Sequence, residues 1–368
     1  MDRAVDSLFA PLTFRCGVTV ENRVALAPLT NGQSNDDGTL GRDELLWLCR
    51  RARGGFGLVS TCAAFVSHEG KGFVGQLGVA TDAHDEGLAT LARSLEIEVT
   101  VPIVQLYHGG ARCPSALTGA RPWSAVAAQE DPATHPDAAR AGTTHEIERA
   151  VEDFVRAAER SKRAGFAGVE VHGAHGYLLC QFLSRHNTRE DGWGGALEGR
   201  ARIVREVVRG IRARCGGDFL VGVRLSPEDF GFAAGMDLDE SVTVARWCAE
   251  DGADFVHLSL WDHTKPGQKR PDEDVIALFR RALPSDIRIL TAGKIWTPDE
   301  ARSVLARGSD MVALGRSAIL NPDWPMDART DNWAPQRGPM SASELAATDI
   351  SPRFIEYLKR FKNIVREG

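Results

Sequence analysis

Short apolar stretches alternate with helix-forming segments along most of the chain, and this alternation limits the folds that the chain can adopt. Each stretch is apolar enough to be buried on both faces, as the strands of a parallel sheet are. Eight strand–helix units with short connections predict an α/β protein, a (β/α)8 TIM barrel. The stretches cover residues 23–28, 57–61, 101–107, 168–173, 219–226, 254–260, 287–293 and 310–316.

The segments between these stretches carry the signals of helix ends. Thr143 and Glu146 have the spacing of a capping box, and Gly165 follows the predicted helix. Thr297 can cap another helix, with Pro298 at its first position. A doubly wound open sheet is the alternative fold. It would normally carry a G-x-G-x-x-G turn after its first strand, and the sequence contains no such motif.

Two regions outside the alternation are treated as parts of one barrel domain that spans residues 1–368. Residues 109–142 follow the third predicted strand and are rich in Gly, Ala and Pro, so we expect an extended loop that acts as a lid on the active face. Residues 326–368 form a C-terminal extension that ends in a predicted helix. We expect this helix to cover its own barrel. The alternative is that it contacts another subunit, as in a homodimer. Its apolar face comprises Phe354, Leu358, Phe361 and Val365.

The charge and composition of the chain argue against several classes of partner. The formal net charge is -6 and the arginines are scattered, which argues against nucleic-acid binding and against a polybasic membrane surface. The sequence has no stretch of 18 apolar residues, so no membrane span is expected, and its start does not resemble a signal peptide. The seven cysteines form no C-x-x-C pair, so we expect reduced thiols in the core of a cytoplasmic protein.

The carboxyl ends of the predicted strands carry the residues that can do chemistry. In a TIM barrel these ends build the active site. Glycines at the ends of the last two strands let backbone N–H groups approach a phosphate, and the basic residue after each glycine supplies charge, so the sequence predicts a phosphate site there. The residues at the strand ends are Pro28, Leu29, Thr30, Ala63, Gln105, Tyr107, His172, His175, Tyr177, Arg224, Gly293, Lys294, Gly315 and Arg316.

Arg224 ends a very apolar strand, and a buried arginine needs a negative partner. One interpretation is an ion pair with Glu170. The other places Arg224 at an anionic ring, such as the N1–O2 edge of a reduced flavin. Gln105 can recognise the pyrimidine-like edge of the same ring, although a structural glutamine is at least as common.

Several motifs, in order along the chain, resemble the Old Yellow Enzyme family of FMN-dependent ene-reductases. The longest is H-G-A-H-G-Y-L-L-C-Q-F-L-S, which starts at His172 and continues into N-T-R-E-D-G-W-G-G. The others are NRVALAPLT, QLYHGG, VGVRLSP and ALGRSAILNPDWP. Together these motifs span about residues 8 to 325, so the resemblance covers the whole predicted barrel.

The resemblance implies a role for each strand-end residue. Pro28 and Leu29 lie beneath the flavin, Thr30 bonds to its C4 oxygen, and Ala63 is near the same edge. Gln105 and Arg224 contact the flavin ring, while Gly293, Lys294, Gly315 and Arg316 contact its phosphate. His172 and His175 bind the carbonyl oxygen of the substrate, which is the logic of an oxyanion hole. Tyr177 donates the proton, and Tyr107 and Trp261 shape the substrate pocket.

The resemblance therefore implies an FMN-dependent NAD(P)H oxidoreductase that reduces an activated C=C bond of a small molecule, such as an enone. The chain ends soon after the barrel, so we expect electrons to come directly from NADH or NADPH. A flavin-dependent desaturase, oxidase, demethylase or isomerase of a specialised metabolite on the same fold is the alternative. A barrel that binds flavin or a phosphorylated ligand without catalysis is a third hypothesis.

Two further observations concern metal binding and the shape of the substrate entrance. The spacing His172-x-x-His175 is compatible with a metal, but no carboxylate or cysteine stands at ligand spacing, so no metal is expected. The chain departs from the family pattern in HGGAR, which is one residue longer, in the segment between Ser184 and Asn187, which is one residue shorter, and in EGR at 198–200. We expect the first two departures to alter substrate access.

Overall fold

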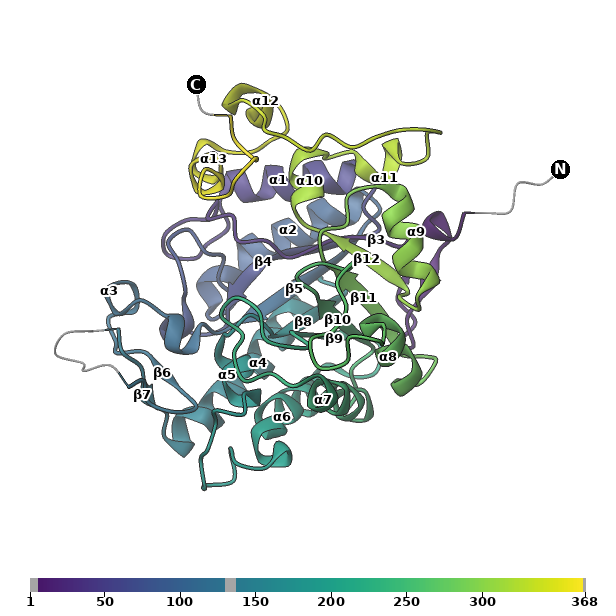
Figure 1. Cartoon of the computed structure of the whole chain (residues 1–368). Helices are drawn as coiled ribbons and strands as arrows, with labels where there is room; N and C mark the ends of the chain where they lie inside the picture. Colours follow the sequence, from purple (N-terminus) through teal and green to yellow (C-terminus); the bar gives the residue numbers. More distant parts are fainter. Residues whose placement is uncertain (1–5, 130–136, 367–368) are drawn as a thin grey trace.

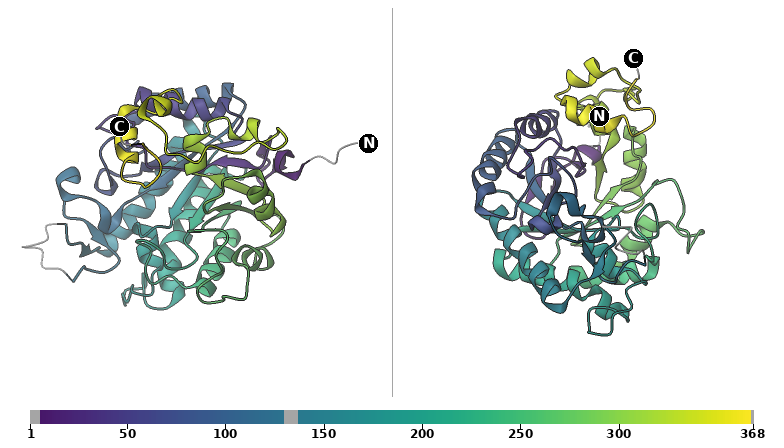
Figure 2. Two further views of the ribbon diagram at one scale, coloured as in Figure 1. Left: turned by 45° about the horizontal axis from the view of Figure 1, so that its top comes forward. Right: turned by 90° about the vertical axis from the view of Figure 1, so that its left-hand side faces the viewer.

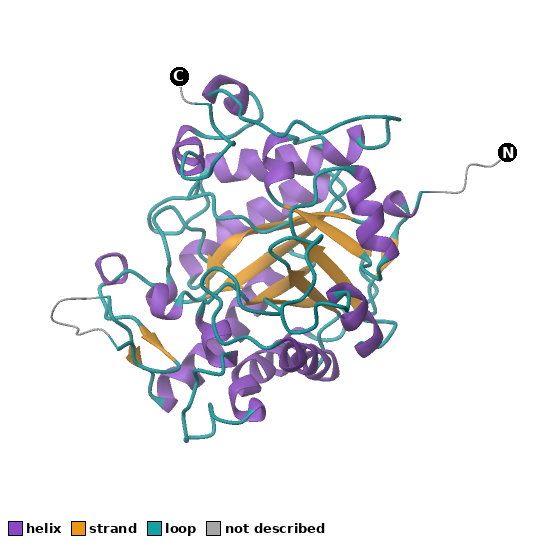
Figure 3. Ribbon diagram, viewed as in Figure 1, coloured by secondary structure: helices purple, strands orange, loops and turns teal. Residues whose placement is uncertain are grey.

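The chain folds as a closed barrel of eight parallel strands surrounded by helices (Figures 1 and 3). The computed structural model describes residues 6–129 and 137–366. The strands are hydrogen-bonded in the order β10-β11-β12-β3-β4-β5-β8-β9, so the TIM barrel prediction is confirmed. Their bounds are β3 (Val24–Leu26), β4 (Leu58–Phe65), β5 (Val101–Tyr107), β8 (Gly168–Gly173), β9 (Leu220–Leu225), β10 (Phe255–Ser259), β11 (Arg288–Ala292) and β12 (Met311–Leu314).

Helices follow the strands and form the outer layer of the barrel (Figure 2). The layer contains α1 (Arg42–Arg53), α2 (Asp85–Ile97), α4 (Thr144–Arg163), α6 (Leu197–Cys215), α7 (Leu238–Glu250), α8 (Val275–Ala282), α9 (Pro298–Ala306), α10 (Arg316–Leu320) and α11 (Trp324–Asp327). The shorter elements are β1 (Leu12–Thr13), β2 (Thr19–Val20), α3 (Ser115–Thr118), β6 (Trp123–Ser124), β7 (Arg140–Ala141), α5 (Leu178–Leu183), α12 (Ala342–Ala346) and α13 (Pro352–Leu358).

The predicted helix caps are present at both positions. The Thr143 side chain accepts a hydrogen bond from the backbone N–H of Glu146, and the Glu146 carboxylate accepts one from the backbone N–H of Thr143, which forms the capping box of α4. Thr297 caps α9 in the same way, with Pro298 in the first turn. These bonds satisfy N–H groups that have no partner inside the helix.

Strand β4 is longer than the sequence predicted. The predicted strand ends at residue 61 with the polar pair Ser60 and Thr61, but β4 continues to Phe65. The Thr61 hydroxyl accepts from the backbone N–H of Gln105 and donates to the carbonyl of Cys62, so it replaces regular ladder bonds at an irregularity between Ser60 and Ala63. Buried polar residues in a strand are tolerated when they are hydrogen-bonded in this way.

The barrel interior is apolar near the amino ends of the strands and polar near their carboxyl ends. The hairpin of β1 and β2 contributes Phe14, whose ring lies 5.7 Å from that of Phe255 inside the barrel. Ile103 on β5 and Phe255 on β10 are apolar interior residues. Two positions nearer the carboxyl end of each strand, the interior residue is polar, Gln105 on β5 and His257 on β10. The open, polar end is therefore the end where a site can form.

The C-terminal segment departs from the prediction of one long helix. Helix α13 ends at Leu358; further along the chain, Asn363 adopts a left-handed backbone conformation with φ 62°, and Val365 pairs with Met340. The predicted helical face through Val365 is therefore wrong. The segment does cover its own barrel, as expected, since the ring of Phe354 on α13 lies 5.9 Å from Trp47 on α1 (Figures 1 and 2).

The described part of the predicted lid lies at one side of the barrel. Strands β6 and β7 form a small parallel sheet (Figure 1). The Arg189 guanidinium donates hydrogen bonds to the carbonyls of Ala125 and Gly142, which directly follow β6 and β7. Residues 130–136 of the predicted lid lie outside the described residues, so a lid function stays a prediction. None of the helices in the described ranges has the length and apolar character that crossing a membrane requires.

Candidate active site

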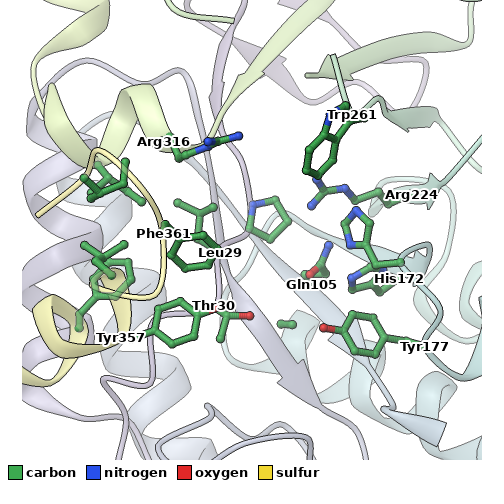
Figure 4. A pocket seen from close by; sticks show the side chains of 17 residues that line it. Leu29, Thr30, Gln105, His172, Tyr177, Arg224, Trp261, Arg316, Tyr357 and Phe361 are labelled. Atoms are coloured by element: carbon green, nitrogen blue, oxygen red, sulfur yellow. The ribbon is translucent and has the colours of Figure 1, made fainter. Parts of the chain in front are cut away.

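The carboxyl ends of the strands and the C-terminal segment enclose a cavity of about 440 Å³. Side chains from several elements point into it (Figure 4). The structure thus brings together most of the residues that the sequence analysis selected. Those that line this cavity are Pro28, Leu29, Thr30, Ala63, Gln105, His172, His175, Tyr177, Arg224, Trp261 and Arg316.

A smaller cavity of about 230 Å³ adjoins the first, at the turns after β11 and β12. It is lined by Gly293, Lys294, Gly315 and Arg316, the four residues predicted to hold a phosphate. Because the two cavities share part of their lining, a ligand with a flat ring and a phosphate can extend from one to the other. The shared residues are Leu29, His175, Arg224, Trp261 and Arg316.

The two basic residues of the smaller cavity differ in how they are paired. Lys294 forms an ion pair with Asp262 at 3.1 Å and lies over the ring of Trp261. Within residues 6–129 and 137–366, Arg316 has no ion-pair partner, so it is the cation available to an anionic ligand. At Gly293, a Cβ atom would lie 3.0 Å from the backbone nitrogen of His263, so this turn passes close to the loop after β10.

His172 lies on β8 with its ring buried and its tautomer defined by a hydrogen bond. Its Nδ1 accepts from the backbone N–H of Ala174 at 3.3 Å. The pKa of His172 is lowered to about 3, by burial first and by the charge of Arg224 second. The ring is therefore neutral at pH 7, and its proton is on Nε2, the nitrogen that can donate into the cavity.

His175 is oriented by two serines that the sequence analysis did not select. Its backbone, with φ 61°, donates to the Ser226 hydroxyl at 3.0 Å, and its Nε2 lies 2.6 Å from the Ser259 hydroxyl. Ser259 also accepts from Arg224 at 3.1 Å. Burial, followed by the charge of Arg224, lowers the pKa of His175 well below its usual value, so this ring is also neutral.

Tyr177 immediately precedes α5, and its ring contacts a histidine and an arginine. The ring centroid is 5.0 Å from that of His172 and 4.4 Å from the guanidinium carbon of Arg112. Arg112 also donates to the carbonyl of His175 at 2.9 Å and lies 3.9 Å from the ring centre of Phe232. Arg112 is the last residue of the HGGAR segment, so this segment contacts the proposed proton donor.

Tyr107 does not line the cavity, contrary to the prediction that it shapes the substrate pocket. Its side chain is 1% exposed and its ring packs behind Tyr177 at a centroid distance of 4.5 Å. A Cβ atom at Gly72 would lie 2.2 Å from the Tyr107 hydroxyl, so that glycine makes room for it. Burial, with Tyr177 next, raises the pKa of the Tyr107 phenol well above its usual value. Tyr107 therefore supports Tyr177 rather than the substrate.

A buried polar group lies beneath Arg224 and links three strands. Glu170 accepts from the Gln105 amide and bonds to Nδ1 of His257, both at 2.7 Å. Burial raises the pKa of Glu170, but His257, Arg224 and Gln105 outweigh burial and hold this pKa below its usual value. Burial lowers the pKa of His257, while the adjacent Glu170 opposes this shift.

This arrangement argues against a direct ion pair between Arg224 and Glu170, one of the two interpretations of Arg224. Glu170 is bonded to Gln105 and His257, and the described residues contain no ion pair between Glu170 and Arg224. The buried Nε of Arg224 has no hydrogen-bond partner in the structure. A buried guanidinium nitrogen without a partner is costly, so it is a position where a ligand acceptor fits.

The C-terminal segment supplies residues that sequence reasoning missed. Tyr357 from α13 lies beside Thr30 in Figure 4, across from Tyr177. Burial and then Tyr177 raise the pKa of the Tyr357 phenol, while Thr30 opposes them. The chain has three tyrosines, and all of them stand in or behind this cavity. The other residues that this segment contributes are Phe354, Leu358, Phe361 and Ile364.

The residues present fit an FMN molecule. The unpartnered Nε of Arg224 suits the anionic edge of a reduced ring, Gln105 is held in position by Glu170, and Arg316 is free to bind a phosphate. A flat ring on Pro28 to Thr30 would lie in the larger cavity. Among the described residues, no three His, Cys, Asp or Glu side chains are grouped so that they could hold a metal ion.

Comparisons with known proteins agree with this geometry. The model of the NADH:flavin oxidoreductase / NADH oxidase family matches residues 7–332. The probable NADH-dependent flavin oxidoreductase YqiG of Bacillus subtilis is 36% identical over 330 residues, which are 88% of this chain and 87% of that protein. Three longer relatives also match, and the chain spans between 33% and 49% of their length.

Two solved structures are similar over almost the whole chain. The old yellow enzyme homologue from Zymomonas mobilis superposes with a TM-score of 0.80 at 25% identity, over 94% of this chain and 99% of that one. Morphinone reductase in complex with tetrahydroNAD gives a TM-score of 0.78 at 29% identity, over 92% of this chain and 93% of that one.

Proposed function

The chain belongs to the NADH:flavin oxidoreductase / NADH oxidase family, and we propose that within this family it reduces an activated C=C bond, such as that of an enone. It is an Old Yellow Enzyme homologue with FMN as cofactor and NADH or NADPH as reductant. The observation that carries the proposal is the position of Tyr177 next to His172, with ring centroids 5.0 Å apart in one cavity. A proton donor beside a neutral hydrogen-bond donor suits a substrate that accepts a proton near a carbonyl group.

The proposed roles of the residues follow from their contacts. FMN, when bound, supplies the hydride. The Nε2–H of His172 donates to the carbonyl oxygen and polarises the C=C bond, and charge that develops on this oxygen is stabilised by a donor already in place. His175, held by Ser259, completes the oxygen site. Tyr177 gives its phenolic proton to the carbon next to the carbonyl.

The remaining site residues are proposed to hold the cofactor. Thr30, Ala63 and Gln105 line the larger cavity around the position of a ring, with Pro28 and Leu29 beside them. Gly293, Lys294, Gly315 and Arg316 line the smaller cavity, where they would contact the phosphate. Trp261, which is 62% exposed at the rim, is proposed to contact the substrate.

The alternative of a desaturase, oxidase, demethylase or isomerase was motivated by the shortened segment between Ser184 and Asn187. This segment does not contribute to the lining of the 440 Å³ cavity. Its Ser184 hydroxyl instead bonds to the carbonyl of Ala234. The structure thus offers no specific observation in favour of the alternative, and the reduction of an activated C=C bond is preferred.

Location and assembly are also proposed from the chain itself. All seven cysteines are free thiols, which supports the expected cytoplasmic location. The C-terminal segment lines the cavity of its own chain, so a homodimer is not needed to complete this part of the site. A homodimer stays a prediction that light scattering of the purified protein can test.

An anaerobic visible spectrum of the purified protein tests the proposal. It is recorded before NADPH, after NADPH, and after addition of 2-cyclohexenone. We expect a flavin band that bleaches with NADPH and returns with the enone. Bleaching by an organic substrate in the absence of nicotinamide would favour the alternative, and a reduced flavin that no activated alkene reoxidises would contradict the proposed reaction.

A further inference from the structure

Glu170 is a buried carboxylate that the proposed reaction does not use. It lies on β8 and its hydrogen-bond partner His257 lies on β10; both residues are 1% exposed, and neither lines the 440 Å³ cavity. Two residues that do line the cavity stand beside them in the barrel, because Gln105 pairs with Glu170 across β5 and β8, and Arg224 pairs with His257 across β9 and β10. Glu170 and His257 therefore adjoin residues that are proposed to contact the flavin.

Glu170 determines which atom of the Gln105 amide faces the cavity. Its Oε1 lies 2.7 Å from Nε2 of Gln105. Burial raises the pKa of Glu170, but His257 and Arg224 outweigh burial, so the group is ionised at pH 7. An ionised carboxylate can only accept a hydrogen bond, so Gln105 must turn its NH2 group toward Glu170 and leave its carbonyl oxygen for the cavity. That oxygen suits an N–H group on the pyrimidine-like edge of a flavin ring.

The negative charge of Glu170 also acts on Arg224 through space. Arg224 is 7% exposed, and within residues 6–129 and 137–366 it has no ion-pair partner. Burial lowers the pKa of Arg224, and the charge of Glu170 is the first contribution that opposes burial. Charges interact more strongly in a buried site than in water. Arg224 favours the negative charge that a flavin ring gains on reduction, so the opposing carboxylate of Glu170 makes the reduced ring less stable than Arg224 alone would.

We propose that Glu170 is a positioning residue for the cofactor, which presents the carbonyl oxygen of Gln105 to the flavin ring and, by opposing the charge of Arg224, lowers the midpoint potential of the flavin. The inference rests on the proposed function in one respect, namely that Gln105 and Arg224 contact the ring. A lower potential makes the reduced flavin a stronger hydride donor to the substrate. His257 supports this role by donating from Nδ1 to Glu170 at 2.7 Å, which holds the carboxylate where it meets Gln105.

The test compares the wild-type holoenzyme with Glu170→Gln, which removes the charge but keeps the shape and an oxygen that can accept from Gln105. The midpoint potential is measured against a reference dye at pH 7, which needs neither a nicotinamide nor an organic substrate. We expect Glu170→Gln to favour the reduced flavin about tenfold, which for a two-electron couple raises the potential by about 30 mV. The Kd of oxidised FMN, followed by flavin fluorescence on dilution of the holoenzyme, should change much less, because the hydrogen bond to Gln105 can persist.

Glu170→Asp keeps the charge and should keep the wild-type potential, so it tests the proposal even if Glu170→Gln does not fold. Glu96→Gln makes the same chemical change on the exposed face of α2 and is the matched control, which should leave the potential and the Kd unchanged. The proposal is overturned if the potential of Glu170→Gln equals that of the wild type or falls, or if Glu170→Asp raises the potential as much as Glu170→Gln does. A merely structural role predicts instead that both variants bind FMN more weakly at an unchanged potential.

Failure of the proposed function is a different result. In that case an enone does not reoxidise the reduced flavin. The potential, which is measured with the dye alone, still decides the role of Glu170.

Discussion

Tyr177 differs from the other two tyrosines of the chain in what surrounds its ring. Tyr107 is buried behind it, and Tyr357 comes from the C-terminal segment beside Thr30. Only Tyr177 combines contact with His172 and contact with the guanidinium of Arg112. These contacts hold the phenol in one orientation next to the group that is proposed to bind the carbonyl oxygen, which is what a general acid requires.

Tyr177→Phe is therefore expected to slow reoxidation of the reduced enzyme by an enone about 10²–10⁴-fold, the usual contribution of a general acid. Reduction by NADPH should change little, because this step needs no proton from tyrosine. Stopped-flow absorbance measures both half-reactions. Tyr357→Phe is the matched control and should reoxidise within a few-fold of the wild type. Equal slowing of both half-reactions by Tyr177→Phe would remove Tyr177 from the role of proton donor.

His172 and His175 offer different numbers of free nitrogens to a ligand. The Nδ1 of His172 is bonded to its own backbone turn and its Nε2–H can donate into the cavity, whereas Nε2 of His175 is bonded to Ser259. His172→Ala should therefore raise the Kd of a para-substituted phenol about tenfold or more, the loss expected for a hydrogen bond to a charged group. Titration followed by the flavin spectrum measures this Kd. A larger increase of this Kd in His175→Ala than in His172→Ala would mean that His175, and not His172, is the main donor to the phenol oxygen.

At the scale of elements, the sequence predicted a strand or a helix start correctly where the local residue pattern alone determines it. All eight strands lie where apolar stretches were found, and α4 and α9 begin at their predicted caps. The errors occur where distant residues decide. Strand β4 continues through Thr61 because Gln105, on the next strand, bonds to it. Helix α13 stops at Leu358, and the chain then turns back so that Val365 pairs with Met340, which lies 25 residues earlier in the sequence.

The same distinction separates the site residues that could be predicted from those that could not. A strand end marks His172 and Arg224 as parts of the open face, whatever their partners are. Ser259 also stands at a strand end, so its position offered a signal, but its bonds to His175 and Arg224 follow only from the closed barrel. Tyr357 gave no signal, because an apolar face on a terminal helix does not show which cavity it covers.

The C-terminal segment is expected to contribute to cofactor binding as an element. Phe361 lines the cavity, is 42% exposed, and lies between Leu29 and Tyr357 in Figure 4. If its ring covers about 40 Å² of a bound flavin, removing it costs about 1 kcal/mol at ~25 cal/mol per Å². Phe361→Ala should then raise the Kd of FMN about fivefold, as measured by fluorescence titration of the apoprotein. Ile97→Ala, on the exposed face of α2, is the control and should leave the Kd unchanged.

At the scale of the whole molecule, the burial of histidines makes the stability of the barrel depend on pH. The pKa of His108 is lowered to about 4 and that of His172 to about 3, in both cases by burial first. An unfolded chain returns each histidine to about 6.5, so the unfolded state binds more protons than the folded state below that pH. The free energy of unfolding is therefore greatest above pH 6.5 and falls as the pH falls toward the folded-state values of 4 and 3.

His108→Gln tests this coupling of protonation to the whole fold. Its Nδ1 accepts from the backbone N–H of Gly110 at 3.1 Å, and a glutamine oxygen can accept the same bond without titrating. Between pH 7.5 and pH 5, His108 alone should cost the wild type about 2 kcal/mol of unfolding free energy, and the variant should be spared this loss. Urea unfolding at the two pH values measures the difference within each protein, so a lower stability of the variant at pH 7.5 does not matter. His145→Gln, at an exposed position on α4, controls for the loss of one histidine. If the two variants lose equal stability between pH 7.5 and pH 5, burial of His108 does not set the acid limit of the barrel.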